Sequence, residues 1–250
     1  MYPRIALAAF VALLWPIAAG AAEITVLSTQ AVEGAYRELV PQFEKASGHK
    51  VTTVFTGTLD AQKRIAAGEQ YDLIIMAGPA IDDLIKSGKV ATGSRVDLAS
   101  SGIGLAVRAG APKPDIRTTD ALKRTLLAAK SIGYSTGPSG VYLTDLFRRL
   151  GIADQIKPKL KQTPTGVFVG SILARGEVEI GFQQVSELTH FPGIDYVGPL
   201  PVDVQLVTVF SSGMQIGAKA RDAARAWVTF LTSPAAAAVF RSKDLEPAGL

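Results

Sequence analysis

The sequence predicts an α/β protein with parallel-type sheets flanked by helices. Short apolar strands alternate with amphipathic helices along the chain, which is typical of βαβ units. Turns rich in serine, threonine and glycine follow several strands, at the points where helices begin. Because ligands of open parallel sheets bind at the carboxyl ends of strands, we expect these turns to meet in one cleft.

The first 22 residues have the features of a cleavable secretory signal peptide. Arg4 gives a positive start, residues 5–17 are apolar, and small residues at 18–22 predict cleavage after Ala21 or Ala22. The apolar run is too short for a comfortable membrane span. An exported chain without cysteine favours a bacterial periplasm as its location.

The mature chain has a small positive charge and no basic cluster. Removal of residues 1–22 takes away one arginine and leaves 25 basic against 22 acidic residues, a net charge of +3 (25 − 22). The scattered basic residues argue against nucleic acid as a partner. A mild positive field suits a small anionic ligand, although it decides little.

Strand and helix signals follow one another along the mature chain. The first part predicts strands at 23–27, 50–55 and 71–76, followed by helices at 32–43, 60–67 and 81–86. A strand at 101–107 precedes a turn at 109–114, which we interpret as a lobe boundary. The second part predicts helices at 119–130, 141–150 and 167–174, strands at 178–182, 196–197 and 204–210, and helices at 220–231 and 234–240.

Four hydroxyl-containing turns form the candidate ligand site: 28–30, 56–58, 135–140 and 163–166. The turn at 135–140 contains three hydroxyls, two glycines and a proline before a helix. Such a turn leaves backbone N–H groups free at the positive end of the helix dipole, where an anion binds without lysine or arginine. The same residues also occur in ordinary turns.

Other chemistries have little support in the sequence. His49 and His190 lack metal-ligand spacing. Ser139 does not complete a nucleophile elbow, because Val141 occupies the position of the last glycine. We therefore predict no catalytic residue, no metal site and no cofactor.

Arg64, Gln183 and Gln184 leave the class of ligand open. Arg64 lies one helical turn after Thr58 and either reaches a ligand carboxylate or faces solvent. The two glutamines either donate to an oxyanion or form a polar sheet edge. A hydroxyl-lined site without arginine would favour an oxyanion, and an inward Arg64 would favour an organic carboxylate.

Several segments, in their order and spacing, carry a resemblance that covers the whole mature chain. They are 24–27 before the helix 31–43, 55–65 with Gly68, 72–77, 138–142, 180–184 and 230–236. Together they resemble the periplasmic solute-binding proteins of ABC transporters, in particular the molybdate-binding type. That resemblance implies a two-lobed type II periplasmic binding protein fold with two crossover hinge strands, closing around its ligand.

The resemblance implies lobe one at 23–107 plus 206–250 and lobe two at 108–205. It implies a monomer that delivers a small anion to an ABC permease or a membrane sensor. The family's serines fall on Ala31 and Thr58, its backbone donors near Ser139 and Gly166, and its tyrosine on Gln184. The candidate ligand-binding residues are Ser28, Thr29, Gln30, Ala31, Gly57, Thr58, Ser139, Gly140, Gly166, Val167 and Gln184.

Two of the family's side-chain donors are therefore changed, and each missing hydrogen bond to a buried oxyanion costs about 1–3 kcal/mol. We predict capture of a molybdate- or tungstate-like oxyanion for an ABC transporter. The alternative is a small organic carboxylate, bound for uptake or sensing, which the glutamine amides suit equally well. An exported hydrolase is less favoured, because no nucleophile with a base stands out.

Overall fold

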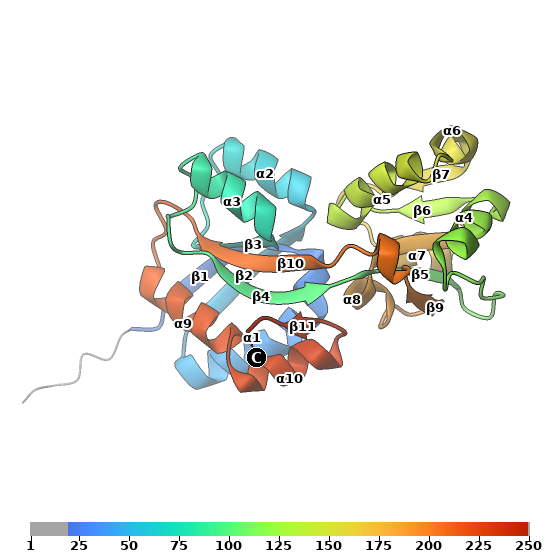
Figure 1. Ribbon diagram of the computed structural model, residues 1–250. Helices are drawn as coiled ribbons and strands as arrows, with labels where there is room; N and C mark the ends of the chain where they lie inside the picture. Colours follow the sequence, from blue (N-terminus) through green and yellow to red (C-terminus); the bar gives the residue numbers. More distant parts are fainter. Residues whose placement is uncertain (1–19, 250) are drawn as a thin grey trace, which may run out of the picture.

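The computed structural model describes residues 20–249, which form two α/β lobes side by side (Figure 1). Most of the predicted signal peptide, residues 1–19, lies outside the described residues. The first lobe contains a six-stranded sheet in the order β11-β4-β10-β3-β1-β2. Its strands are β1 (Glu23–Thr29), β2 (Lys50–Thr56), β3 (Leu73–Ala77), β4 (Val96–Ser101), β10 (Thr208–Met214) and β11 (Glu246–Pro247).

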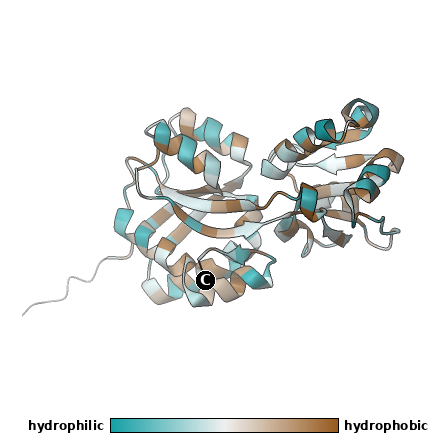
Figure 2. Ribbon diagram, viewed as in Figure 1, coloured by the Kyte–Doolittle hydropathy of each residue, from teal (hydrophilic) through white to brown (hydrophobic). Residues whose placement is uncertain are grey.

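Helices cover both faces of this sheet because neighbouring strand residues point to opposite sides. Val26 and Ile75 belong to the core beneath α1 (Glu33–Ser47), α9 (Arg221–Leu231) and α10 (Pro234–Ser242). Leu27 and Ile74 belong to the core beneath α2 (Thr58–Ala66) and α3 (Gly78–Lys86). Apolar residues accordingly concentrate on the strands and on the inner sides of these helices (Figure 2).

The larger of these two cores is centred on a buried aromatic pair. The Trp227 indole lies edge-on to the Tyr36 ring with centroids 5.0 Å apart, and its Nε1–H donates to the Tyr36 hydroxyl. This bond satisfies the indole N–H, so the Trp227 ring can be fully buried. This contact fixes α9 against α1.

The second lobe contains a five-stranded sheet in the order β7-β6-β8-β5-β9. Its strands are β5 (Ile103–Arg108), β6 (Ile132–Tyr134), β7 (Leu160–Gln162), β8 (Ile180–Gln184) and β9 (Ile194–Pro199). One face packs against α4 (Thr119–Ala128), α5 (Pro138–Arg149) and α6 (Ala153–Ile156), and the other against α7 (Val169–Ala174) and α8 (Val185–Leu188).

Both sheets are mixed. The predicted α/β class, with two sheets flanked by helices, is confirmed, but the strand directions are more varied than the parallel-type sheets we predicted. β1 pairs parallel with β2 and β3, but β10 is antiparallel to β3 and β4. β6 pairs parallel with β7 and β8, but β5 is antiparallel to β8 and β9. The antiparallel strands are those that continue into the connections between the lobes.

The chain crosses from the first sheet to the second at Gly102. The predicted strand 101–107 corresponds to β5 but starts two residues too early, because β4 ends at Ser101 and β5, which starts at Ile103, pairs in the other sheet. The structure therefore puts residues 103–107 in the second sheet, whereas we had placed them in lobe one. A side chain at position 102 would press on the Gln205 amide, whose nitrogen lies 3.1 Å from the position of a Cβ.

The return connection also differs from its prediction. The predicted strand 204–210 is present as β10 but overlaps it only at residues 208–210, because residues 202–204 form a 3₁₀ turn and β10 begins at Thr208. The alternation of polar and apolar residues was read four residues too early. Five elements that are short or irregular were not predicted: β4, β7, β11, α6 and α8.

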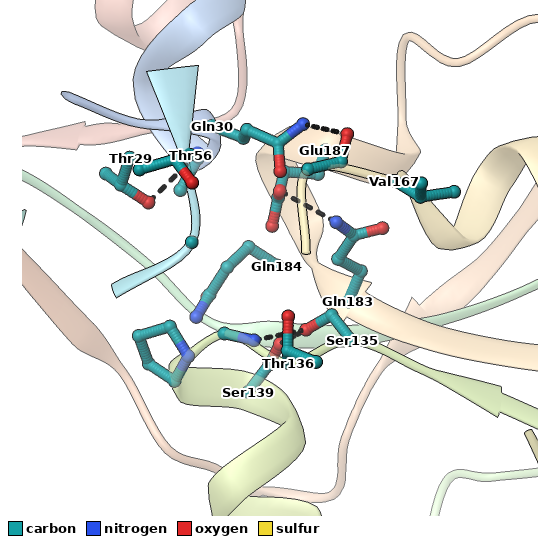
Figure 3. A pocket seen from close by; sticks show the side chains of 15 residues that line it. Thr29, Gln30, Thr56, Ser135, Thr136, Ser139, Val167, Gln183, Gln184 and Glu187 are labelled. Carbon is teal, nitrogen blue, oxygen red and sulfur yellow. Dashed lines mark hydrogen bonds between the residues drawn. The ribbon is translucent and has the colours of Figure 1, made fainter. Parts of the chain in front are cut away.

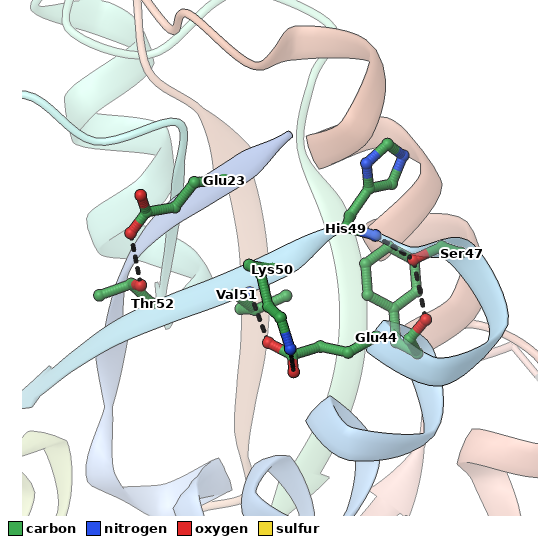
Figure 4. Close-up of polar contacts among 8 residues, drawn as sticks. Glu23, Glu44, Ser47, His49, Lys50, Val51 and Thr52 are labelled. Atoms are coloured by element: carbon green, nitrogen blue, oxygen red, sulfur yellow. Dashed lines mark hydrogen bonds and ion pairs between the residues drawn. The ribbon is translucent and has the colours of Figure 1, made fainter. Parts of the chain in front are cut away.

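Polar contacts fix the edge of the first sheet to the end of α1, as Figure 4 shows. The Glu44 carboxylate of α1 accepts from the Val51 N–H at 2.9 Å and from Lys50 Nζ at 2.8 Å. Gly48 ends α1 with φ 75°, as its position after the helical pattern predicted. His49 Nδ1 accepts from the Ala22 N–H at 3.1 Å.

Within residues 20–249, none of the helices has the length and apolar character needed to span a membrane.

Candidate functional site

A small pocket lies between the lobes, where the carboxyl ends of strands from both sheets face each other (Figure 3). Its empty space, including open solvent at its mouth, is about 360 Å³. Most of its lining residues carry polar side chains. The lining residues are Thr29, Gln30, Ala31, Thr56, Gly57, Ser135, Thr136, Gly137, Pro138, Ser139, Gly166, Val167, Gln183, Gln184 and Glu187.

The second lobe contributes the turn between β6 and α5. The Ser135 and Ser139 hydroxyls lie 3.1 Å apart, and Ser135 Oγ also accepts from the Gly137 N–H at 3.2 Å. The N–H groups of Gly140 and Val141 donate to the Gly137 carbonyl. Since proline has no N–H, the Ser139 N–H is the donor of the first turn of α5 that remains for a ligand.

The first lobe contributes the turns after β1 and β2. Thr29 precedes a 3₁₀ turn, η1 (Gln30–Val32), and its hydroxyl accepts from the Ala31 N–H at 3.5 Å. The Thr56 hydroxyl donates to Asp60 at 2.8 Å. Gly57 caps α2, so the positive end of the dipole of α2 also points toward the pocket.

Glu187 brings the pocket a carboxyl group. It lies on α8, four residues after Gln183, whose Nε2 donates to Glu187 Oε1 at 2.7 Å. The Gln183 amide is itself held by the Val169 N–H, which donates to Gln183 Oε1 at 2.7 Å. Gln183 is only 2 % exposed, so water does not compete for these bonds.

Burial raises the pKa of Glu187 to about 8, against the hydrogen bonds from Gln183 and the Gln184 backbone, which lower it. The negative charge of Glu33, on α1, adds to the rise. A carboxyl group with this pKa is mostly protonated at pH 7 but changes its charge close to neutrality. It can therefore donate to an anionic ligand in one state and accept a proton in the other.

Gln184 lines the pocket, but its amide holds the interlobe connections. With its nitrogen turned toward the carbonyls of Ser101 and Gly102, it donates to both at 3.0 Å, and its oxygen accepts from Thr208 Oγ1 at 3.1 Å. All three partners lie on the segments that join the lobes. The amide is thus engaged by the protein itself, whereas we expected it to donate to a ligand.

Three contacts connect the lobes beside the pocket or farther round the same interface. Gln30 Nε2 donates to the Gly166 carbonyl at 3.0 Å. Ser186 Oγ donates to the Ala31 carbonyl at 2.9 Å. His190 Nε2 lies 3.1 Å from a carboxylate oxygen of Asp244. These bonds hold the lobes together around the pocket.

The structure brings together eight of the eleven predicted ligand-binding residues. Thr29, Gln30, Ala31, Gly57, Ser139, Gly166, Val167 and Gln184 line the pocket. Ser28, Thr58 and Gly140 do not line it. The Ser28 hydroxyl donates to the Thr29 carbonyl at 3.2 Å, and the N–H of Gly140 is used within its turn.

Arg64 points away from the pocket. Its guanidinium binds Asp60 at 2.7 Å and lies 3.5 Å from Glu69. No lysine, arginine or histidine lines the pocket among residues 20–249. We expected a hydroxyl-lined site without arginine to favour an oxyanion. The pocket meets this condition, but it also contains the carboxyl group of Glu187, which the condition did not consider.

Glu187 is the lining residue that sequence reasoning missed outright. Thr56 belongs to one of the four predicted turns of the site but was not chosen as a ligand-binding residue, and it lies at the end of β2. Glu187 follows the paired glutamines by one helical turn, and the helix α8 that carries it was not predicted. The available clue was an acidic residue close to the end of a buried strand.

Comparison with known proteins gives two kinds of relative. The chain is 41 % identical over 258 aligned positions to an aconitate isomerase of a Pseudomonas species, covering 99 % of this chain and 98 % of that protein. It is 28 % identical over 235 positions to the molybdate-binding protein of Azotobacter vinelandii, covering 90 % of each.

The fold also matches solved structures. The periplasmic molybdate-binding protein of Azotobacter vinelandii superimposes with a TM-score of 0.75 at 19 % identity, covering 89 % of this chain and 98 % of that one. This match supports the type II periplasmic binding protein fold. The family model for bacterial extracellular solute-binding proteins matches residues 24–244. The chain therefore belongs to the bacterial extracellular solute-binding protein family, and its fold is similar to that of a molybdate-binding protein.

Proposed function

We propose that this protein binds a small unsaturated polycarboxylate of the aconitate class in the interlobe pocket and isomerises it by proton transfer. The observation that carries the proposal is Glu187, a carboxyl group with a pKa of about 8 that faces a pocket lined by neutral donors. The 41 % identity with an aconitate isomerase over nearly the whole chain supports it.

The chemistry needs no oxidant and no cofactor. In aconitate a methylene group lies between a carbon–carbon double bond and a carboxylate. The ionised Glu187 takes a proton from this methylene, and the C–H electron pair forms a new double bond. The electron pair of the old double bond takes up a proton from the now protonated Glu187 at its far carbon, so the double bond moves, the geometric isomer can form and Glu187 is ionised again.

The neutral lining suits this substrate in two ways. A protonated Glu187 adds no negative charge next to a polycarboxylate, and the hydroxyl of Ser139 can donate to it. The helix N-termini of α2 and α5 supply positive potential without a counter-ion. Charge that develops on a carboxylate during proton removal would be stabilised by the same donors.

The test is isomerisation of aconitate by the mature protein in D₂O, followed by proton NMR. We expect turnover with deuterium in the product, because the proton held by Glu187 exchanges with solvent. Glu187→Gln should lower turnover by roughly 100-fold or more and leave substrate affinity within a few-fold. Glu246→Gln, at an exposed carboxyl that does not line the pocket, is the matched control. Full activity of Glu187→Gln would overturn the proposal.

A second candidate is capture of a molybdate- or tungstate-like oxyanion in the periplasm and its delivery to an ABC permease, without chemistry. The absence of cationic side chains from the described pocket lining favours it, because neutral donors at helix N-termini can hold an oxyanion, and a molybdate-binding protein is among the chain's relatives. A thermal shift with molybdate in the presence of competing phosphate, together with no binding of aconitate, would select this candidate.

A further inference from the structure

We propose that Gln183 is a positioning residue: it fixes Glu187 Oε1 as a hydrogen-bond acceptor and so directs the exchangeable proton to Oε2. This inference rests on the proposed function, because it assigns a role within the same site. It concerns which oxygen of the Glu187 carboxyl group carries the proton, and not only the presence of that group.

The orientation of the Gln183 amide is settled by a backbone group. The Val169 N–H can only donate, so the atom 2.7 Å away must be the amide oxygen. The amide nitrogen therefore faces Glu187, 2.7 Å from Oε1. An amide nitrogen can only donate, so Oε1 accepts this bond. The carbonyl oxygen of a protonated carboxyl group is a better acceptor than its hydroxyl oxygen, so the bond favours Oε1 as the carbonyl and leaves the proton on Oε2, where it can exchange with a ligand.

The surroundings keep this relay rigid. Gln183 lies on β8, which has β6 on one side and β5 on the other. Val169 is the first residue of α7, and this helix has no side-chain cap of its own, so the Gln183 oxygen takes that place. Both residues are buried, at 0 % and 2 % exposure. A long side chain at the end of a central strand is thereby held in one rotamer.

Few other charged groups lie on the elements packed against α8. Glu33 begins α1 and is paired with Arg37 at 2.8 Å. Asp195 on β9 accepts from the Gly110 N–H, and Arg108 ends β5. His190, just past α8, is paired with Asp244. Of these, Glu33 acts on Glu187, and Gln183 is the side chain that donates to it.

Two substitutions separate positioning from simple support of the fold. Gln183→Glu keeps an oxygen for the Val169 N–H but removes the donor to Glu187. Gln183→Leu removes both. If Gln183 only caps α7, the glutamate variant should behave as the wild type and the leucine variant should be the defective one.

The experiment measures the Glu187 carboxyl directly by ¹³C NMR titration of the glutamate-labelled protein, assigned with Glu187→Gln. The pH profile of aconitate turnover is measured in parallel. We expect the Glu187 midpoint to rise by about one pH unit in Gln183→Glu, because a donor is replaced by a like-charged group. The turnover number should fall about 10-fold or more, with KM within about 3-fold. Gln155→Glu, on an exposed part of α6, is the control and should leave both measurements unchanged.

The outcomes distinguish this inference from the proposed function. An unchanged Glu187 midpoint and pH profile in Gln183→Glu would overturn the positioning role, even if the protein isomerises aconitate. A raised midpoint in a protein that does not isomerise aconitate would retain the positioning of Glu187 and overturn the isomerase proposal alone.

Discussion

Gln205 binds both backbone groups of Ile103 across the two connections between the lobes. Its Oε1 accepts from the Ile103 N–H at 2.8 Å, and its Nε2 donates to the Ile103 carbonyl at 2.9 Å. The amide thus takes the place of a neighbouring strand at the point where the chain leaves β4 for β5. The outgoing and returning segments are therefore fixed to each other.

We expect Gln205→Ala to lower the free energy of unfolding by about 2 kcal/mol, because it leaves the fully buried Ile103 N–H without its partner. It should also loosen the relative orientation of the lobes. Urea unfolding and small-angle X-ray scattering of the ligand-free protein measure the two effects. Gln155→Ala, at an exposed position, should change neither. A stable Gln205→Ala protein with unchanged scattering would contradict this role.

Two glycines of the α5 turn make a matched pair. A Cβ at Gly140 would lie 1.7 Å from the backbone oxygen of Ser135, whereas a Cβ at Gly137 would meet only Ser135 Oγ at 3.5 Å. We expect Gly140→Ala to displace the turn, weaken ligand binding at least 10-fold and destabilise the protein by roughly 1–3 kcal/mol. Gly137→Ala should fold with near wild-type stability. Calorimetric titration and thermal unfolding compare the two, and equal behaviour would refute the steric argument.

Asp72 anchors the start of α9 to β1. Burial alone would raise its pKa, but hydrogen bonds from Ala220, Thr25 and Lys219 hold the pKa below its ordinary value. Four donors lie within 2.7–2.9 Å of the carboxylate. We expect Asp72→Asn to cost about 3 kcal/mol at pH 7, because an amide cannot accept from all of them.

The pH dependence of this contribution has a definite sign. Since the folded state lowers the pKa of Asp72, its stabilising effect is complete above the pKa of the unfolded chain. It is lost as the pH falls through the folded value. The difference between wild type and Asp72→Asn in urea unfolding should therefore shrink in acid. The exposed Asp154→Asn is the control, and a pH-independent difference would argue against an ionised Asp72.

Glu187 should destabilise the protein at alkaline pH. Its folded pKa of about 8 lies above the ordinary value of 4.5, so the folded state holds a proton that the unfolded chain releases. Stability then falls as the pH rises from 4.5 through 8. We expect Glu187→Gln to raise Tm by about 2–4 °C at pH 9, with solvent at the pocket mouth limiting the effect. At pH 4.5 the two proteins should melt together. A difference that does not change with pH would speak against the raised pKa.

Much of the candidate site could be predicted because it consists of turns with recognisable chemistry. Ser139, Gly57 and Thr29 were placed by one rule: a hydroxyl or glycine turn after a strand and before a helix. Gly140, which the same rule selected as a ligand-binding residue, does not line the pocket. Its role is steric, because it lets the turn close on Ser135, and its N–H donates within that turn. Gln184 lies in the pocket as expected, but its partners come from residues 101–102 and 208, which no local pattern connects to it.

The sequence by itself determined the α/β class, most of the helices and the polar character of the cleft. These features depend on periodicity, on glycine stops such as Gly48 and on the composition of turns, which act within a few residues of one another. Only the tertiary structure decided where the chain crosses between the lobes, at Gly102 and Gln205. It also brought Glu187 to the pocket, with Gln183 and Val169 behind it. Burial and hydrogen-bond direction set the protonation of that carboxyl, and both depend on packing between segments far apart in the chain.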